Sequence, residues 1–388
     1  MRLRGSPAFV RFWLASTVSD FGTYVTTVAL SVLVLLTLGG SALDQGWVNA
    51  ARWAPYLLFG LFAGLWVDRY RRRPVLIAGD LGRGLILASV ALLAALGRLE
   101  LPLLMALLFA FGTLALAGDA AHQSFLPHLV PRPLLTRANA RLEQSTSVAQ
   151  TAGGALAGGL VSALGAPLAL AADSLSHLFS AAVLTTVRAP KGAAAPVHRA
   201  GAGGQGMRAR IGAGLRWVYG HPRLAPLALS THGWFVGSSM LGAVVPVLIL
   251  AELGVGAIGL GMVLTCAGMG AALGTSVSER LGDRWGAGRT IIAARLAQPA
   301  AVALMSLAPV LAGGLAPPGA AGHGHPAACP LPVWAGLLAA AAVMLGSALV
   351  LLGSPFRGAR IDERPWEGPG VGGAVTTPES GPAGRPDR

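Results

Sequence analysis

Several ionisable residues lie inside long apolar stretches of this sequence, where charged side chains are rare, and five of them are candidates for function. A charge at the centre of a lipid bilayer costs about 2.5–3.5 kcal/mol, so a charged residue at such a position is a candidate functional group. Carboxylates there can exchange protons, and arginines can line a polar cavity. The candidates for proton coupling or for a cavity lining are Asp20, Arg52, Arg83, Asp119 and Asp173.

Asp20 is the best single candidate for proton coupling, and Asp119 is the next. As a proton carrier, Asp20 must bind a proton near neutral pH, which burial without a nearby cation favours. If Arg83 or Arg52 pairs with it, Asp20 stays ionised and forms a fixed structural ion pair. Both interpretations remain open, whereas a pair of Asp173 with Arg52 is expected to be structural.

The composition indicates that most of the chain lies in a membrane. Hydrophobic residues make up 54% of the 388 positions and charged residues only 12%, whereas a soluble domain carries about 25% charged residues. A membrane-spanning helix needs about 20 mostly apolar residues. Such runs lie at 9–37, 46–67, 74–96, 101–125, 143–165, 167–187, 224–250, 256–279, 288–312 and 331–353. We therefore predict an all-α integral membrane protein with about ten transmembrane helices, in groups of six and four.

These runs divide the chain into two helix bundles joined by a linker. Residues 1–187 are predicted to form an N-terminal six-helix bundle, and residues 188–223 a cytoplasmic linker with an amphipathic helix. Residues 224–356 are predicted to form a partial C-terminal bundle of about four helices. Residues 357–388 are rich in Gly and Pro, which is typical of a disordered cytoplasmic tail.

The basic residues predict the orientation of the chain. If the N-terminus is cytoplasmic, the outer loops hold only one arginine, Arg98, and the other loop arginines lie inside. Cytoplasmic loops carry this excess in membrane proteins. We expect a multi-pass protein of the plasma or inner membrane with both termini in the cytoplasm. The same distribution explains the net charge of +13 without a nucleic-acid partner.

A glycine–aspartate–arginine motif joins the second and third predicted helices. It reads Gly64-Leu-Trp-Val-Asp68-Arg69-Tyr-Arg-Arg72-Arg73, and a weaker copy with Ser278 in place of the aspartate closes the eighth run. A glycine permits close helix approach, and the aspartate can accept hydrogen bonds from arginines or a helix N-terminus. The residues predicted to form a cytoplasmic gate are Gly64, Asp68, Arg69, Arg72 and Arg73.

This motif resembles the signature of the major facilitator superfamily. Further stretches resemble its branch of enterobactin-exporter-like and macrolide-efflux-like proteins, and the resemblance covers residues 9–310. They include Phe12–Gly22, Ala51–Pro55, Asp80–Arg83 and Leu126–Ala140. The resemblance implies a secondary active transporter that exports a small amphipathic compound, such as a drug or siderophore, by alternating access. It implies a monomer in the lipid bilayer with a small-molecule substrate, driven by the proton gradient without a cofactor.

A second resemblance lies in the fifth predicted helix. Its glycines match the glycine-rich motif of exporters, with an alanine in place of the usual proline. We expect them to form a packing face first and a hinge second, because small residues let helices approach closely. The residues are Gly153, Gly154, Gly158 and Gly159.

The chain departs from the superfamily in its number of helices. The superfamily has two halves of six helices, and the last two of the twelve are predicted to be missing here. A truncated, transport-inactive membrane protein or a scaffold is therefore the alternative function. An enzyme is not expected, because the ionisable residues are scattered rather than clustered at one depth. A metal site at His323, His325 and Cys329 is not expected either.

Overall fold

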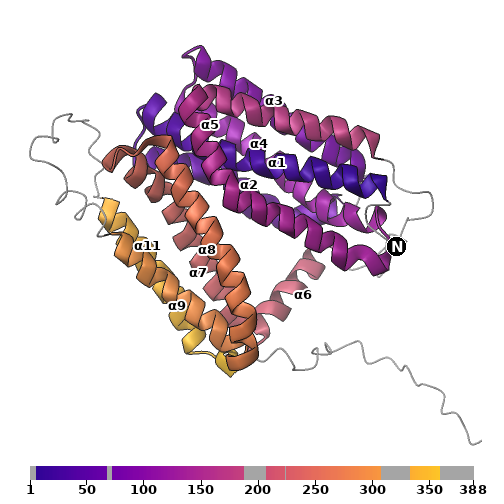
Figure 1. Ribbon diagram of the computed structural model, residues 1–388. Helices are drawn as coiled ribbons and strands as arrows, with labels where there is room; N and C mark the ends of the chain where they lie inside the picture. The colour runs from indigo at the N-terminus through magenta and orange to yellow at the C-terminus, as the bar shows by residue number, and fades with distance from the viewer. Residues whose placement is uncertain (1–5, 68–71, 188–206, 223, 307–332, 359–388) are drawn as a thin grey trace, which may run out of the picture.

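The computed structural model describes residues 6–67, 72–187, 207–222, 224–306 and 333–358 (Figure 1). All the regular elements in this part of the chain are helices. The first half contains α1 (Pro7–Val32), α2 (Ala42–Val67), α3 (Arg72–Ala95), α4 (Leu101–Phe125) and α5 (Leu135–Thr186). The second half contains α6 (Met207–Gly220), α7 (Leu224–Val247), α8 (Gly256–Trp285), α9 (Ala287–Met305) and α11 (Val333–Leu352).

Local sequence signals fix the ends and the kink of the helices that carry the polar residues. Helix α1 starts after Ser6, whose hydroxyl accepts a hydrogen bond from the Phe9 N–H, and Pro7 occupies its first turn. Helix α5 contains a break at Gly165, where φ is 81°, and Pro167 follows. A left-handed φ suits glycine. The chain turns back at the point that the sequence predicted between the runs 143–165 and 167–187.

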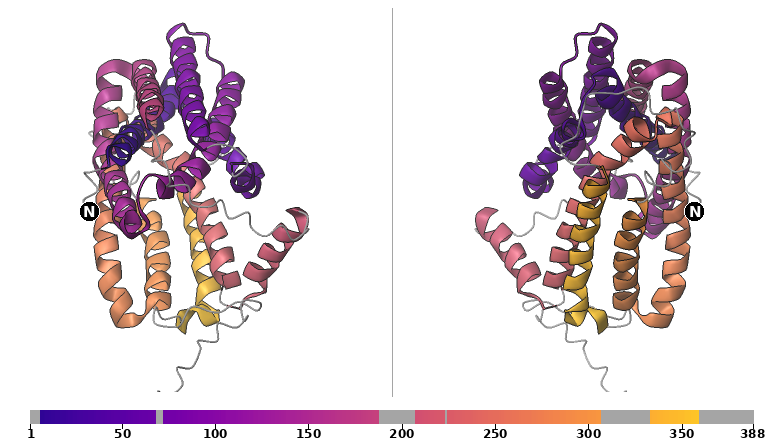
Figure 2. Two further views of the ribbon diagram at one scale, coloured as in Figure 1. Left: turned by 90° about the vertical axis from the view of Figure 1, so that its right-hand side faces the viewer. Right: turned by 90° about the vertical axis from the view of Figure 1, so that its left-hand side faces the viewer.

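The helices pack as two groups (Figures 1 and 2). Helices α1 to α5 form the first group, in which α5 packs against α1 and α3, and α4 packs against α2 and α3. Helices α7, α8, α9 and α11 form the second group, and α5 and α2 contact it through α8 and α7. The domain boundaries predicted at 187, 223 and 356 stay a prediction.

In the described part of the chain, the two groups share an apolar core at one end. One cluster of buried residues joins Leu33 and Leu108 of the first half to Leu248 and Leu260 of the second. At the end where α1 begins, a separate cluster around Phe12 contains residues of the first half alone. In Figure 1 the second group diverges from the first toward the end where the N-terminus lies.

Seven helices of the described residues are long and apolar enough to cross a membrane. They are α1, α3, α4, α5, α7, α8 and α11, of which α5 contains two segments joined at Gly165. This finding supports the all-α membrane fold. The count of about ten spans in groups of six and four stays a prediction.

Candidate functional site

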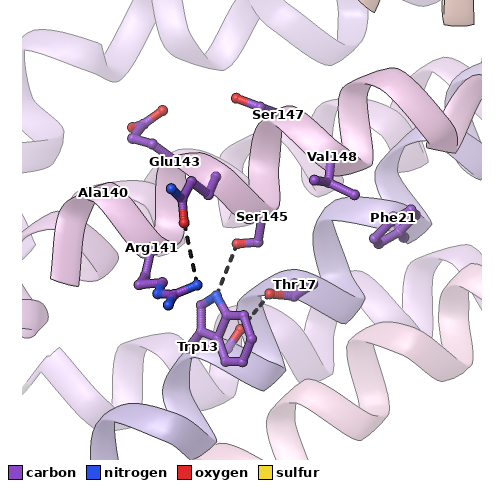
Figure 3. Close-up of a pocket in the computed structure, with 10 residues that line it drawn as sticks. Trp13, Thr17, Phe21, Ala140, Arg141, Glu143, Ser145, Ser147 and Val148 are labelled. Carbon is purple, nitrogen blue, oxygen red and sulfur yellow. Dashed lines mark hydrogen bonds between the residues drawn. The ribbon is translucent and has the colours of Figure 1, made fainter. Parts of the chain in front are cut away.

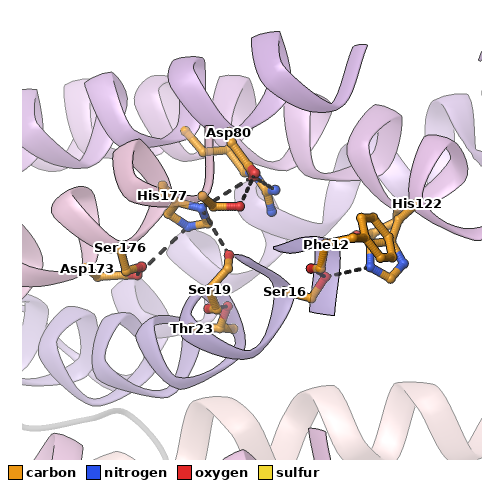
Figure 4. A network of polar contacts seen from close by, with 12 residues as sticks. Phe12, Ser16, Ser19, Thr23, Asp80, His122, Asp173, Ser176 and His177 are labelled. Atoms are coloured by element: carbon orange, nitrogen blue, oxygen red, sulfur yellow. Dashed lines mark hydrogen bonds and ion pairs between the residues drawn. The ribbon is translucent and has the colours of Figure 1, made fainter. Parts of the chain in front are cut away.

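A fully buried histidine lies between two carboxylates in the first helix group (Figure 4). His177 is 0% exposed, and its Nδ1 lies 3.6 Å from Oδ1 of Asp80 in α3. Its Nε2 lies 3.9 Å from Oδ1 of Asp173. His177 and Asp173 share one face of α5 because they are four residues apart. We call Asp80, Asp173, His177 and their polar neighbours the His177 network.

Each carboxylate of the His177 network has further partners. Asp80 forms an ion pair with Arg83 and accepts a hydrogen bond of 2.6 Å from the Ser180 hydroxyl. Asp173 accepts hydrogen bonds from the hydroxyls of Thr26 and, at 2.7 Å, Ser176. Buried polar groups are costly unless they are paired. The network therefore ties α1, α3 and the second segment of α5 together.

A glycine of α1 makes room for this network. A Cβ atom at Gly22 would overlap the carboxylate of Asp173 and the hydroxyl of Ser176. Three residues earlier, the Ser19 hydroxyl lies 3.2 Å from Nδ1 of His177. The face of α1 that carries Ser19 and Gly22 thus borders both carboxylate–histidine contacts.

A cavity of about 160 Å³ lies beside the network, between α1, α2, α3 and α4. It brings together three of the predicted residues, Arg52, Arg83 and Asp119. Asp119 accepts a 2.7 Å hydrogen bond from the Tyr56 hydroxyl. The remaining lining residues are Thr23, Trp53, Phe111, Gly112 and Ala115.

Arg52 contacts aromatic rings in this cavity. Its guanidinium carbon lies 5.6 Å from the ring centre of Phe111 and 5.9 Å from that of Trp53, within the range of cation–π attraction. The structure places Asp173 in hydrogen bonds with Thr26 and Ser176. These contacts of Asp173 were not predicted from the sequence, and the structural pair of Asp173 with Arg52 stays a prediction.

Asp20 lies outside this cavity, on the side of α1 that faces the first segment of α5. It is half-buried, and its Oδ2 accepts a 2.8 Å hydrogen bond from the Thr146 hydroxyl. Arg83, one suggested partner of Asp20, forms an ion pair with Asp80. Among the described residues, the hydrogen-bond donor to the Asp20 carboxylate is therefore a neutral hydroxyl group.

An open groove of about 770 Å³ lies between α1 and the start of α5 (Figure 3). Trp13 forms part of its wall and donates a 3.2 Å hydrogen bond from Nε1 to the Ser145 hydroxyl. The other lining residues are Thr17, Phe21, Ala140, Arg141, Glu143, Gln144, Ser147 and Val148. The groove combines aromatic surface with charged and polar groups.

The glycines of α5 have different neighbours. A Cβ atom at Gly154 would lie 2.6 Å from the backbone oxygen of Gly261, and one at Gly158 would lie 2.6 Å from that of Ala257. At Gly268 of α8, a Cβ atom would lie 2.6 Å from the backbone oxygen of Gln150. We call this contact of α5 with α8 the glycine seam. The seam joins the two helix groups.

Two further glycines of the motif lie off the seam. A Cβ atom at Gly153 would lie 3.0 Å from the Tyr24 side chain of α1, and one at Gly159 would meet nothing within 4 Å.

The predicted cytoplasmic gate is described only in part. Asp68 and Arg69 lie outside the described residues, and Gly64 lies in α2. Nη1 of Arg72 lies 3.0 Å from Nε2 of His128, and Arg73 donates to the backbone oxygens of Leu184 and Thr185. The two arginines therefore connect the start of α3 to the ends of α4 and α5, and their role as a gate stays a prediction.

Residues 4–316 match the family described as transmembrane secretion effector. The chain belongs to this family. Its relatives include an uncharacterized MFS-type transporter of Mycobacterium tuberculosis, 32% identical over 139 residues. That match covers 35% of this chain and 31% of the relative. The major facilitator resemblance of the sequence is thereby confirmed.

Two other relatives of this secretion-effector family member are named as efflux proteins. Macrolide efflux protein A of Streptococcus pyogenes is 27% identical over 190 residues, which cover 47% of this chain and 45% of that protein. Multidrug efflux pump Tap of Mycobacterium tuberculosis is 31% identical over 221 residues, which cover 55% and 51%. The chain thus spans about a third to a half of the relatives it matches.

Solved structures resemble the family member in fold. A bacterial homolog of the human lysosomal transporter Spinster has a TM-score of 0.58 at 16% identity, over 90% of this chain and 77% of that chain. A bacterial homologue of the iron transporter ferroportin has a TM-score of 0.58 at 15% identity, over 91% and 84%. The chain is therefore a multi-pass membrane protein with a major facilitator fold, and these relatives are transporters rather than enzymes.

Two candidate functional residues of this family member were not identified from the sequence. His177 received no role, although its spacing of four residues from Asp173 places both on one helix face. Tyr56 lies four residues after Arg52 in α2 and supplies the hydroxyl that binds Asp119. Both could have been found by asking which polar residues share a face with an intramembrane charge.

Replacing Tyr56 with phenylalanine is expected to destabilise the purified protein by about 1 kcal/mol, because Asp119 loses a hydrogen-bond donor. Asp119 is exposed, so water can partly replace the hydroxyl. Thermal unfolding in detergent measures the change. The control is Tyr219→Phe in α6, an exposed residue whose hydroxyl has a long contact of 3.5 Å with Nε2 of His232. Equal shifts in the two variants would contradict a specific role of the Tyr56–Asp119 hydrogen bond.

Proposed function

We propose that this family member is a secondary active transporter that exports a small amphipathic compound in exchange for protons. The observation that carries the proposal is the His177 network, which places two carboxylates and an imidazole inside a membrane helix bundle. Ionisable groups at such depth mark ion and proton pathways in transporters. The efflux names of two relatives support the outward direction of transport.

Alternating access is the transport mechanism that the arrangement of the helices supports. The two groups share the glycine seam and a continuous apolar core near one end, and have separate cores beyond it. Rocking about such a contact opens one side of the membrane at a time. Both solved neighbours are described as inward-facing, which fits an opening at the end where α1 begins.

The groove between α1 and α5 lies on this proposed open side and is the proposed entry point for substrate. Its aromatic residues Trp13 and Phe21 suit an amphipathic compound, and Asp20 lies on the same helix. We propose that the protein lies in the plasma or inner membrane. In the proposed orientation the open side faces the cytoplasm, and both termini lie in the cytoplasm. In this orientation Asp20 exchanges its proton with the aqueous opening.

The proton gradient supplies enough free energy for this exchange. One charge that crosses 100 mV releases about 2.3 kcal/mol, and a tenfold concentration ratio costs about 1.4 kcal/mol. One proton per substrate can therefore sustain a ratio of several tens. Neither a cofactor nor a second subunit is required by this mechanism.

The test is extrusion of a fluorescent amphipathic dye from vesicles that contain the full chain. We expect a pH gradient to drive extrusion, and Asp20→Asn to reduce the driven component at least about tenfold. Asparagine keeps an oxygen for the Thr146 hydroxyl but cannot ionise. Asp283→Asn, an exposed position near the end of α8, is the matched control.

The outcomes of this experiment separate the candidate functions. Unchanged extrusion in Asp20→Asn would remove Asp20 from the coupling mechanism. Dye movement that ignores the pH gradient in the unmodified chain would contradict proton coupling. Absence of dye movement under every gradient would favour the transport-inactive alternative.

A further inference from the structure

A half-buried arginine of the second helix group lies between α9 and α7. The guanidinium carbon of Arg295 lies 4.8 Å from the ring centre of Trp234. Its Nη2 donates a long hydrogen bond of 3.5 Å to the Thr231 hydroxyl. Its Nη1 is buried and has no hydrogen-bond partner among the described residues. The guanidinium group therefore has unused donor capacity.

The sequence of the second half contains few acidic residues. Residues 284–361 contain neither Asp nor Glu, and the acidic residues between 224 and 283 are Glu252, Glu279 and Asp283. Glu252 ends the π-helical turn after α7, and Asp283 lies near the end of α8. Arg295 lies about 12 Å along α9 from its first residue, away from these two ends. Glu279 lies inside α8, and its side chain is outside the described part of the chain.

Arg83 of the first helix group has a different environment. Arg83, about 16 Å along α3, forms an ion pair with Asp80. A charge in the membrane is costly unless a counter-charge or water compensates it. Among the described residues, Arg295 contacts an aromatic ring and a hydroxyl group and forms no ion pair, so a negative charge from outside the chain would complete the site.

The surrounding side chains hold Arg295 in a fixed position. Nε1 of Trp234 donates a hydrogen bond to Oε1 of Gln298, which lies three residues after Arg295 in α9. The ring is thereby fixed over the guanidinium group, which retains N–H donors for a further partner. A guanidinium group offers two parallel donors that match the oxygens of a carboxylate or phosphate.

We propose that Arg295 binds the carboxylate or phosphate group of an amphipathic anion. The molecule is either a soluble compound that enters from the aqueous phase or a phospholipid whose headgroup carries the phosphate. Apolar side chains of α7 and α9 and the adjacent lipid contact its hydrocarbon part. The site is separate from the His177 network and does not depend on the proposed proton coupling.

The test uses the fluorescence of Trp234, because binding of an anion to Arg295 alters the cation next to the ring. The full chain in phosphatidylcholine nanodiscs is titrated with decanoate and with decyl phosphate. The signal of Trp234 is obtained by subtracting the same titration of Trp234→Phe. We expect a saturable change for at least one anion, and no saturable change with decanol, which lacks the charge.

Variants of α9 connect the signal to the guanidinium group. Arg295→Gln keeps a donor for Thr231 and is expected to weaken binding at least about tenfold. Arg289→Gln, an exposed position of the same helix, is the matched control and is expected to leave binding unchanged. Arg295→Lys keeps the charge without the paired donors and takes the place of Arg295→Gln if that variant does not fold.

The two sources of the anion are distinguished by the lipid. A Trp234 signal that changes when phosphatidylglycerol replaces part of the phosphatidylcholine, and that then no longer responds to decanoate, identifies a lipid headgroup. A response to the soluble anions in both lipids identifies a soluble ligand. Equal titrations of the unmodified chain and the Arg295 variants, or no response to any of these anions, would overturn the proposal.

Discussion

Valine at position 158 is expected to disrupt the contact between the two helix groups and to abolish dye export. A Cβ atom there would lie 2.6 Å from the backbone oxygen of Ala257 and 3.1 Å from Cα of Gly261. Backbone atoms cannot move aside as the end of a flexible side chain can. Overpacking of this kind costs about 1–3 kcal/mol, and valine adds two methyl groups beyond the Cβ.

The next residue in the chain provides the control. Gly159 is exposed, and a Cβ atom there would meet no other atom within 4 Å. Gly159→Val changes helix propensity as Gly158→Val does, but it leaves the glycine seam intact. Thermal unfolding of the purified variants measures stability, and dye extrusion from vesicles measures transport. We expect Gly158→Val to lower the stability and to abolish dye extrusion, and Gly159→Val to leave both unchanged.

A graded series makes the prediction sharper. Gly158→Ala adds only the Cβ atom, and its effect is expected to lie between those of glycine and valine. Gly261→Ala on the opposite side of the seam is expected to reproduce the loss, because its Cβ would lie 2.9 Å from Cα of Gly158. If Gly158→Val and Gly159→Val behaved alike, close packing at the seam would not be the cause.

The sequence predicted the elements better than their contacts. Runs of about 20 apolar residues marked the helices because the bilayer fixes the length of a span. The turn at Gly165 was visible in the same way, since Gly165 and Pro167 interrupt an apolar stretch. The run length contains no information on which helices meet, so the packing of α5 against α8 could not be predicted.

The rotation of a helix explains the different neighbours of the glycine motif. Successive residues of a helix differ by about 100°. Gly154 and Gly158 are four residues apart and face α8 together, whereas Gly153 faces Tyr24 of α1. Gly159 is turned away from both helices. A motif of glycines predicts close packing, and its partners depend on an orientation that one sequence does not contain.

For the candidate site, too, the sequence predicted the position of residues along the helices better than their contacts. Depth in the membrane could be estimated from position in the run, and Arg52, Arg83 and Asp119 do line one cavity. Their pairing depends on which faces of the helices meet. For this reason the sequence suggested Arg83 or Arg52 as a partner for Asp20 and Arg52 as a partner for Asp173, and it did not predict the ion pair of Arg83 with Asp80.

Removal of the His177 imidazole is expected to destabilise the first helix group by about 3 kcal/mol or more. In His177→Ala the carboxylates of Asp80 and Asp173 lose the group between them, and a cavity remains at a fully buried position. Arg83 still compensates Asp80, so the loss falls mainly on Asp173. Thermal unfolding of the purified protein measures this change, with the exposed His232→Ala as the control.

Glutamine at position 177 separates the structural part of this effect from proton handling. Its amide can donate to one of the two carboxylates and fills part of the space, so we expect His177→Gln to recover much of the stability lost in His177→Ala. Because an amide does not titrate, it cannot pass a proton between Asp80 and Asp173. Recovery of stability without recovery of proton-driven extrusion would assign the imidazole to the coupling step. Recovery of both would restrict its role to holding α1, α3 and α5 together, and equal stability of His177→Ala and the unmodified chain would contradict the network as described.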